Sequence, residues 1–173
     1  ADSVIASVDS AEKLSGPGLA VISRTVYADF DPFDEKRFRQ ALDQLQHQDS
    51  NGLAFLELVA AWRDCHRYHH TQHYGEQKPL EVQAIGLGAD TAIVTLPHEV
   101  FVEIGLAIKS ASPFKSTIVI SLANDVDYYI PTRRAFTEGS YEVTTCPLRT
   151  GCGELLRDAA IGALEAVKQD TRA

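Results

Sequence analysis

The hydrophobic residues of this 173-residue chain form short runs rich in Val and Ile, separated by longer stretches with a helical repeat. Such runs are typical of strands. They predict strands at residues 19–27, 80–87, 91–96 and 117–123. Gly88-Ala89-Asp90 joins the second run to the third, which predicts a hairpin. The last run is continuously apolar, which predicts a strand buried on both faces.

Between and after these strands, apolar residues recur every three or four positions, which predicts amphipathic helices. The predicted helices cover residues 35–48, 53–70, 97–111, 131–138 and 153–168. We expect Pro97 to open the third helix, because its missing N–H costs nothing in a first turn. We expect Ser112-Pro113 to end it.

The alternation of strands and helices predicts an α/β fold, a single layered domain with helices packed on a mixed sheet. Residues 1–18 are small and polar and end in Ser15-Gly16-Pro17-Gly18, so we expect a flexible lead-in there. Residues 19–173 are then the α/β domain.

The composition is that of a globular protein, with 45% apolar and 23% charged residues. The net charge of −8 argues against a nucleic-acid partner, which would require a basic face. No apolar run approaches the roughly 20 residues that span a bilayer, so we expect no transmembrane segment. The first residues lack the regions of a signal peptide, so none is expected in this chain unless it has already been removed.

Cys146 and Cys152 bracket the segment Pro-Leu-Arg-Thr-Gly near the C-terminus. They could form a disulfide in an oxidising compartment, or they could remain two unpaired thiols. Cys65 is left over in either case, and three cysteines define no clear disulfide framework.

Polar clusters follow two of the predicted strands. Glu99 comes shortly after one strand, and Tyr129 follows the next. The carboxyl ends of neighbouring parallel strands face one crevice, so we expect these side chains to meet there. A carboxylate beside a phenol suits a hard or borderline metal, or acid–base work. The alternative for Glu99 is a first-turn carboxylate that only stabilises its helix.

Two other polar segments lie near this crevice. Asn124, Asp125 and Asp127 form either an ion- or substrate-binding loop or an Asx turn that bonds the local backbone. Arg133 and Arg134 either bind an anionic group or are solvated surface charges.

A third candidate is a cluster of histidines near the end of the second predicted helix. His66, His70 and His73 share a face if the helix continues that far, and His69 lies beside them. They form either a metal-binding module or a solvated, fraying helix end.

Five short motifs occur in one order along the second half of the chain: Leu96-Pro97-His98-Glu99, Ser112-Pro113-Phe114, Ser121-Leu122-Ala123-Asn124, Tyr129-Ile130-Pro131-Thr132 and Tyr141-Glu142. In this order and at these spacings they resemble the neutral/alkaline (non-lysosomal) ceramidases and their bacterial relatives. The resemblance extends from about residue 80 to residue 168.

That family hydrolyses the amide bond of ceramide with zinc. The resemblance therefore implies a zinc cofactor, an N-acyl-sphingosine-type lipid amide as substrate, and a secreted or periplasmic location. It implies that Glu99 and Tyr129 bind the zinc, and that Tyr141 is catalytic and contacts the substrate carbonyl oxygen. Asn124 is predicted to bind substrate alongside Tyr141. A zinc ion lowers the pKa of its water, and a phenol O–H stabilises an oxyanion.

The chain departs from the family in two places, which are expected to crowd the substrate pocket. His98 stands where the family usually has Gly, and Asp125, Asp127 and Tyr128 fill a loop that is usually small.

The family's histidine zinc ligands lie in an N-terminal region that residues 1–79 do not match. Two ligands are fewer than the three of a usual catalytic zinc site. We therefore expect the C-terminal portion of a larger ceramidase-like catalytic domain, inactive as this chain alone. The alternative is a non-catalytic domain that binds a ligand or partner. Exposed apolar surface could also produce a homo-oligomer.

Overall fold

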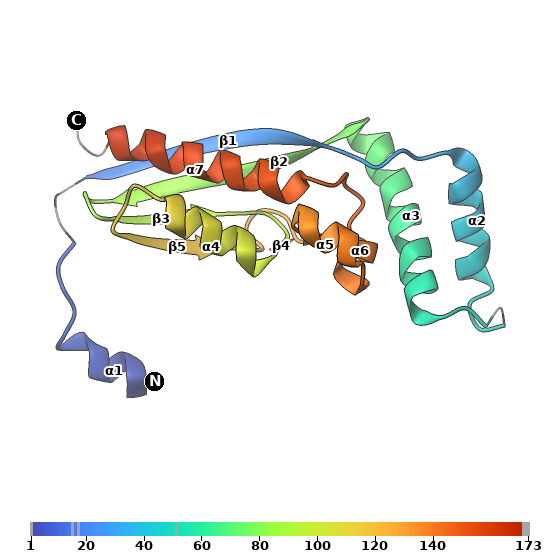
Figure 1. Ribbon diagram of the computed structural model, residues 1–173, viewed down its shortest axis with the longest axis horizontal. Coiled ribbons are helices and arrows are strands. Elements are labelled where there is room, and N and C mark those ends of the chain that lie inside the picture. The colour runs from blue at the N-terminus through green and yellow to red at the C-terminus, as the bar shows by residue number, and fades with distance from the viewer. Residues whose placement is uncertain (1, 15, 17, 51, 171–173) are drawn as a thin grey trace.

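The structure is a computed structural model that describes residues 2–14, 16, 18–50 and 52–170 (Figure 1). Its centre is a four-stranded sheet made of β1 (Leu19–Asp29), β2 (Gln77–Leu87), β3 (Thr91–Thr95) and β5 (Ser116–Ile120). The strands lie in the order β1-β2-β3-β5. The first two pairs are antiparallel and β3–β5 is parallel. The predicted mixed sheet and the predicted hairpin are confirmed.

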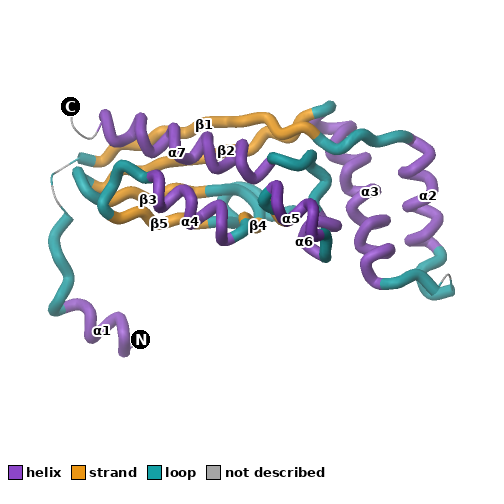
Figure 2. The backbone as a smooth tube through the Cα atoms, viewed as in Figure 1, coloured by secondary structure: helices purple, strands orange, loops and turns teal. Residues whose placement is uncertain are grey.

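Two helices cover one face of this sheet (Figures 1 and 2). Helix α4 (Val102–Ala111) connects the parallel strands β3 and β5, and α7 (Cys152–Asp170) packs on β1 and β2. The facing residues of α7 are small or aliphatic, with Ala160, Ala163 and Leu164 fully buried. Small side chains let the helix approach the sheet closely, and the main core lies in this layer.

A helical hairpin stands at one end of the sheet, inserted between β1 and β2. It consists of α2 (Glu35–Gln46) and α3 (Phe55–Tyr74), which share a small core of Ala41, Ala61 and Cys65. The side of α3 packs against the short helix α6 (Tyr141–Thr145). In the described part of the chain, no helix is long and apolar enough to cross a membrane.

The remaining elements are short. They are α1 (Asp2–Val8), α5 (Arg133–Glu138) and a pair of two-residue strands, β4 (Glu99–Val100) and β6 (Tyr129–Ile130). Helix α1 lies in the segment expected to be a lead-in, and all its side chains with a described exposure are exposed. Neither α1 nor α6 was predicted from the pattern, because neither has enough residues to show a helical repeat.

The predicted start of the third helix was wrong. The helix begins at Val102 rather than at Pro97, and Glu99 lies in β4 instead of in a first helical turn. The physical reason is that residues 96–101 extend β3 and bond to the segment that follows β5. Backbone groups that already have strand partners do not need a helix.

The prediction that residues 117–123 are buried on both faces was also wrong. Strand β5 is an edge strand, and Ile118 and Ile120 are 49% and 43% exposed. Ile118 belongs to a row of apolar residues that runs across all four strands on the face opposite α7, with Val21, Ile85 and Ile93 beside it in register. The continuous apolar run in this segment therefore reflects an exposed apolar face of the sheet and not burial on both faces.

Replacing a residue of the layer under α7 tests which face holds the fold together. Leu164→Ala is expected to lower the free energy of unfolding by about 2–5 kcal/mol, because Leu164 is fully buried. The matched control is Leu155→Ala on the same helix, where the side chain is 37% exposed and the expected loss is about 1 kcal/mol or less. Urea unfolding measures both values, and equal losses would contradict this packing.

Candidate active site

The candidate site depends on a backbone ladder that continues beyond the parallel strands β3 and β5. The N–H of Leu96 donates to the carbonyl of Ile120 (2.8 Å), and the N–H of His98 donates to the carbonyl of Asp125 (2.7 Å). The N–H of Glu99 then donates to the carbonyl of Tyr128 (3.0 Å). The two segments stay joined although one carries a longer loop than the other.

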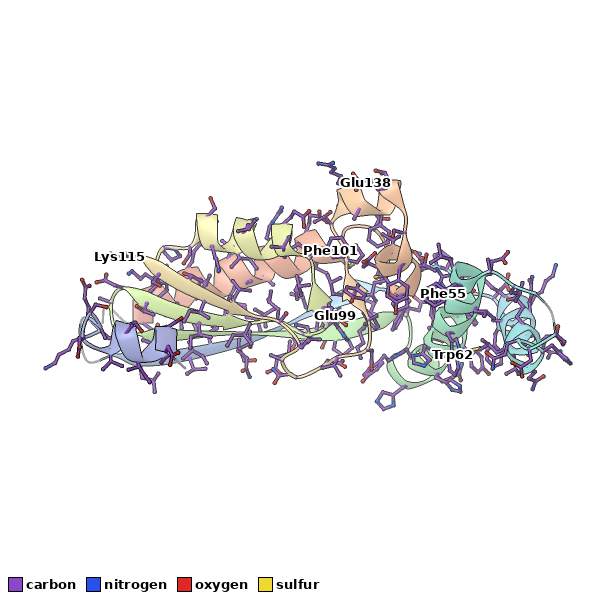
Figure 3. All side chains as sticks on the ribbon, turned by 90° about the horizontal axis from the view of Figure 1, so that it is seen from below. Phe55, Trp62, Glu99, Phe101, Lys115 and Glu138 are labelled. Atoms are coloured by element: carbon purple, nitrogen blue, oxygen red, sulfur yellow. The ribbon has the colours of Figure 1, made fainter. Side chains whose placement is uncertain are left out.

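This ladder sets Glu99 of β4 directly opposite Tyr129 of β6 in a parallel pair. Residues that are paired in register on neighbouring strands point to the same side. Glu99 and Tyr129 therefore share the half-exposed side, and His98 and Tyr128 share the buried side. Figure 3 shows Glu99 and Phe101 in the part of the molecule between the sheet and the helical end. The sequence-based expectation that residues 99 and 129 meet agrees with this geometry.

The carboxylate and the phenol interact directly. A hydrogen bond from the Tyr129 hydroxyl to Glu99 raises the pKa of Tyr129 above its ordinary value. The ring of Tyr141 meets the ring of Tyr129 edge-on, with 6.1 Å between centroids. Phe55, at the start of α3, stacks on the other side of Tyr141 at 5.8 Å. Glu99, Tyr129 and Tyr141 thus lie side by side, and Phe55 of α3 packs against Tyr141.

A buried layer lies under this pair. His98 is fully buried, and its ring stacks on Tyr128 with 4.1 Å between centroids. Its Nδ1 accepts a hydrogen bond from the backbone N–H of Asp127 (3.2 Å), so the proton of the neutral ring sits on Nε2. That nitrogen faces Asp125 Oδ2 at 3.7 Å. Burial lowers the pKa of His98 to about 4, which keeps the ring neutral at pH 7.

The acidic loop is held by a cation of the protein itself. Lys78 is buried, and its Nζ lies 2.7 Å from Asp125 Oδ2 and 3.9 Å from Asp127 Oδ2. Burial is the largest single influence on Asp125 and acts to raise its pKa, but the hydrogen bond from Lys78, the neighbouring positive charges and the hydrogen bond from the Val126 N–H together outweigh burial, and the pKa falls. His70 Nε2 approaches Asp127 at 3.5 Å. The loop carboxylates that suggested ion binding thus already face an ammonium group.

His98 does not crowd the outer site, contrary to expectation. Its φ of 61° is left-handed, a conformation in which glycine is favoured, and this explains why a glycine would suit the position. The side chain points into the core, where it is fully buried, and leaves the exposed side of Glu99 free.

Asn124 contacts the central sheet through its side chain. Its φ is 74°, and its side-chain amide donates to Glu81 on β2 at 3.3 Å. Its role in substrate binding stays a prediction. Arg134 is exposed and pairs with Glu138 one helical turn away at 2.8 Å. That pairing is typical of a surface helix.

The histidine cluster lies on α3, which does continue to Tyr74. The rings of His66 and His70 are 6.4 Å apart, whereas His69 packs edge-on against Phe38. Within the described ranges, no three His, Cys, Asp or Glu side chains are placed to hold a metal ion.

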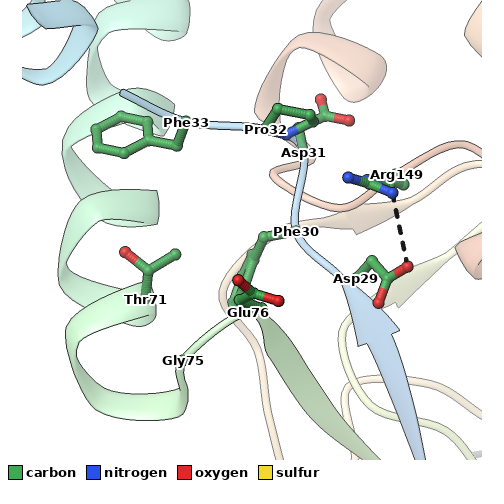
Figure 4. Close-up of a pocket in the computed structure, with 9 residues that line it drawn as sticks. All are labelled: Asp29, Phe30, Asp31, Pro32, Phe33, Thr71, Gly75, Glu76 and Arg149. Carbon is green, nitrogen blue, oxygen red and sulfur yellow. Dashed lines mark ion pairs between the residues drawn. The ribbon is translucent and has the colours of Figure 1, made fainter. Parts of the chain in front are cut away.

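The pockets near the helical end include two that bear on the candidate site. One of about 290 Å³ opens between α3 and α6, and Tyr141, Trp62, His66 and Tyr128 are among its lining residues. The other, of about 550 Å³, lies where β1 ends (Figure 4). It is lined by acidic and aromatic residues, and Arg149 faces Asp29 there at 3.8 Å. Only the first includes a predicted site residue.

Lys78 and Phe55 were missed by sequence reasoning. Lys78 belongs to the alternate positions of β2 that face the core, together with Leu80, Val82 and Ala84. A charged residue at such a position could have indicated a buried ion pair. A buried ammonium requires a carboxylate partner. Phe55 gave no signal, because its contact with Tyr141 depends on how α3 packs.

No family model and no curated protein matches the chain. Among solved structures, neutral ceramidase from Pseudomonas aeruginosa is similar, with a TM-score of 0.51 and 16% sequence identity. The match covers 87% of this chain but only 29% of the ceramidase chain. The class is therefore an α/β domain with a ceramidase-like fold.

The buried His98 predicts a pH dependence of stability. Its pKa is about 4 when folded and about 6.5 when unfolded, so the unfolded chain binds the proton first as the pH falls. The contribution of the neutral His98 to the free energy of unfolding is complete above about pH 6.5. It decreases by about 3 kcal/mol as the pH falls to 4. His98→Asn, which tolerates the left-handed φ, is expected to remove this component.

Urea unfolding between pH 4 and pH 8 measures the effect. His73→Asn is the matched control, because His73 is an exposed residue of α3, and it should keep the wild-type slope. Identical slopes for wild type and His98→Asn would contradict the assignment.

Proposed function

We propose that this chain is part of a ceramidase-like, zinc-dependent amide hydrolase that acts on N-acyl-sphingosine-type lipid amides. Glu99 and Tyr129 bind the zinc, and Tyr141 contacts the substrate carbonyl. The observation that supports the proposal is the parallel register of β4 and β6, which holds a carboxylate against a phenol on the half-exposed side of the ladder.

The donor chemistry of the pair suits a zinc ion in part. A carboxylate and a phenol oxygen are hard donors, and the Tyr129 hydroxyl is hydrogen-bonded to Glu99. Two protein ligands are fewer than the three of a usual catalytic site, so the other ligands come from outside the described residues. Bound zinc supplies Lewis-acid activation of water and of the amide carbonyl.

The residues of this chain then have separate tasks. In the absence of metal, Glu99 accepts a hydrogen bond from the Tyr129 hydroxyl. Tyr141 is 39% exposed and stands next to Tyr129, where its hydroxyl could donate a hydrogen bond to the carbonyl oxygen of a bound substrate. The pocket between α3 and α6 adjoins Tyr141 and offers apolar surface from Val59 and Trp62 to a lipid amide. By itself the chain is expected to be inactive.

Zinc titration by calorimetry tests the proposed ligands. Glu99→Gln and Tyr129→Phe are each expected to weaken zinc binding at least about tenfold, because each removes one ligand oxygen. Glu103→Gln, an exposed acid at the start of α4, is the matched control and should bind like the wild type.

The rival, a non-catalytic binding domain, predicts that neither variant changes zinc affinity. A metal module on α3 predicts instead that zinc binding disappears when His66, His69, His70 and His73 are replaced by Ala. Either outcome would contradict the proposal. Robust zinc-dependent hydrolysis of a fluorescent ceramide by the chain alone would contradict the expectation that it is inactive.

A further inference from the structure

Cys146 and Cys152 meet inside the core, although neither takes part in the proposed function. Cys146 follows α6, and Cys152 is the first residue of α7. They are 1% and 4% exposed and belong to the same buried cluster. Both are free thiols, and the interaction with Cys152 is the largest cause of the raised pKa of Cys146.

Backbone hydrogen bonds fix the segment between the two cysteines against the end of β1. The N–H of Asp31 donates to the carbonyl of Pro147 (3.0 Å), and the N–H of Arg149 donates to the carbonyl of Asp29 (2.9 Å). The turn closes with a hydrogen bond from the Cys152 N–H to the carbonyl of Arg149 (3.2 Å), helped by Gly151 at φ 103°.

Cys65 is not a competing partner in the folded chain. It lies in the separate small core between α2 and α3, whereas the other two cysteines lie under α7. Any disulfide that respects the fold therefore joins residues 146 and 152.

We propose that Cys146 and Cys152 form an intramolecular disulfide when the chain folds in an oxidising environment. Each thiol loses its proton and one electron, and an S–S bond forms between them. A low-molecular-weight disulfide, such as glutathione disulfide, takes up both electrons and both protons as its own S–S bond breaks into two thiols. This disulfide exchange proceeds through a mixed disulfide.

The bond forms during folding rather than afterwards. In the native state both sulfurs are shielded, and the hydrogen bond to Cys152, together with burial, raises the pKa of Cys146. The thiolate is the nucleophile in disulfide exchange, so the native dithiol reacts slowly. The disulfide therefore has a structural role. It links the end of α6, the helix that carries Tyr141, to the start of α7.

Refolding in a glutathione redox buffer tests the proposal. The denatured, reduced chain is diluted into glutathione and glutathione disulfide, alkylated and analysed by intact mass and peptide mapping. The expected product has lost two hydrogen atoms, carries a link between residues 146 and 152, and has one alkylated thiol at Cys65. The same oxidant added to the native reduced chain should act far more slowly.

Matched variants separate the possible pairings. Cys65→Ala should give the same cross-link, and Cys152→Ala should give none. A link that includes Cys65, a persistent glutathione adduct, or three alkylated thiols in the refolded wild type would each overturn the proposal.

A stability measurement gives a second readout. Closing a loop of this length is expected to raise the folding equilibrium constant roughly fiftyfold relative to the reduced chain. Cys152→Ala should show no effect of reductant. An unchanged equilibrium constant in the oxidised wild type would contradict the proposal that this disulfide stabilises the fold.

Discussion

The parallel hydrogen-bonded ladder that begins between β3 and β5 and ends between β4 and β6 determines the candidate site. It brings together residues thirty positions apart and decides which side of the chain each one faces. A slip of one residue in either strand would reverse the sides. Glu99 or Tyr129 would then enter the core, and His98 or Tyr128 would leave it. Site and fold are therefore specified by the same register.

The buried layer under the ladder holds the longer loop in place. Lys78 pairs with Asp125, Asp125 faces His98, and His98 stacks on Tyr128. Burying such groups costs free energy that hydrogen bonds and charge pairs only partly offset. We interpret this buried layer as the feature that stabilises one conformation of the loop before β6. The loop conformation in turn positions Tyr129.

The sequence allowed the α/β class, the hairpin and most helices to be predicted, because long segments carry clear periodicity. The meeting of Glu99 and Tyr129 followed from the rule that parallel strands end at one edge. The prediction that a helix begins at Pro97 was wrong, because Pro also suits the end of a strand and because a strand of two residues is too short to show a period. The contact of Phe55 with Tyr141 and the pairing of Lys78 with the acidic loop depend on tertiary packing, so local patterns did not reveal them.

The most direct test of the central claim is a site-resolved NMR titration of the Tyr129 ring. The hydrogen bond to Glu99 predicts a pKa above the ordinary tyrosine value of about 10 in the wild type, falling toward that value in Glu99→Ala. Tyr27 is an exposed tyrosine on β1, remote in sequence from both residues, and its ring signal provides the internal control. A Tyr129 pKa that is the same in both proteins would show that the carboxylate and the phenol are not held together.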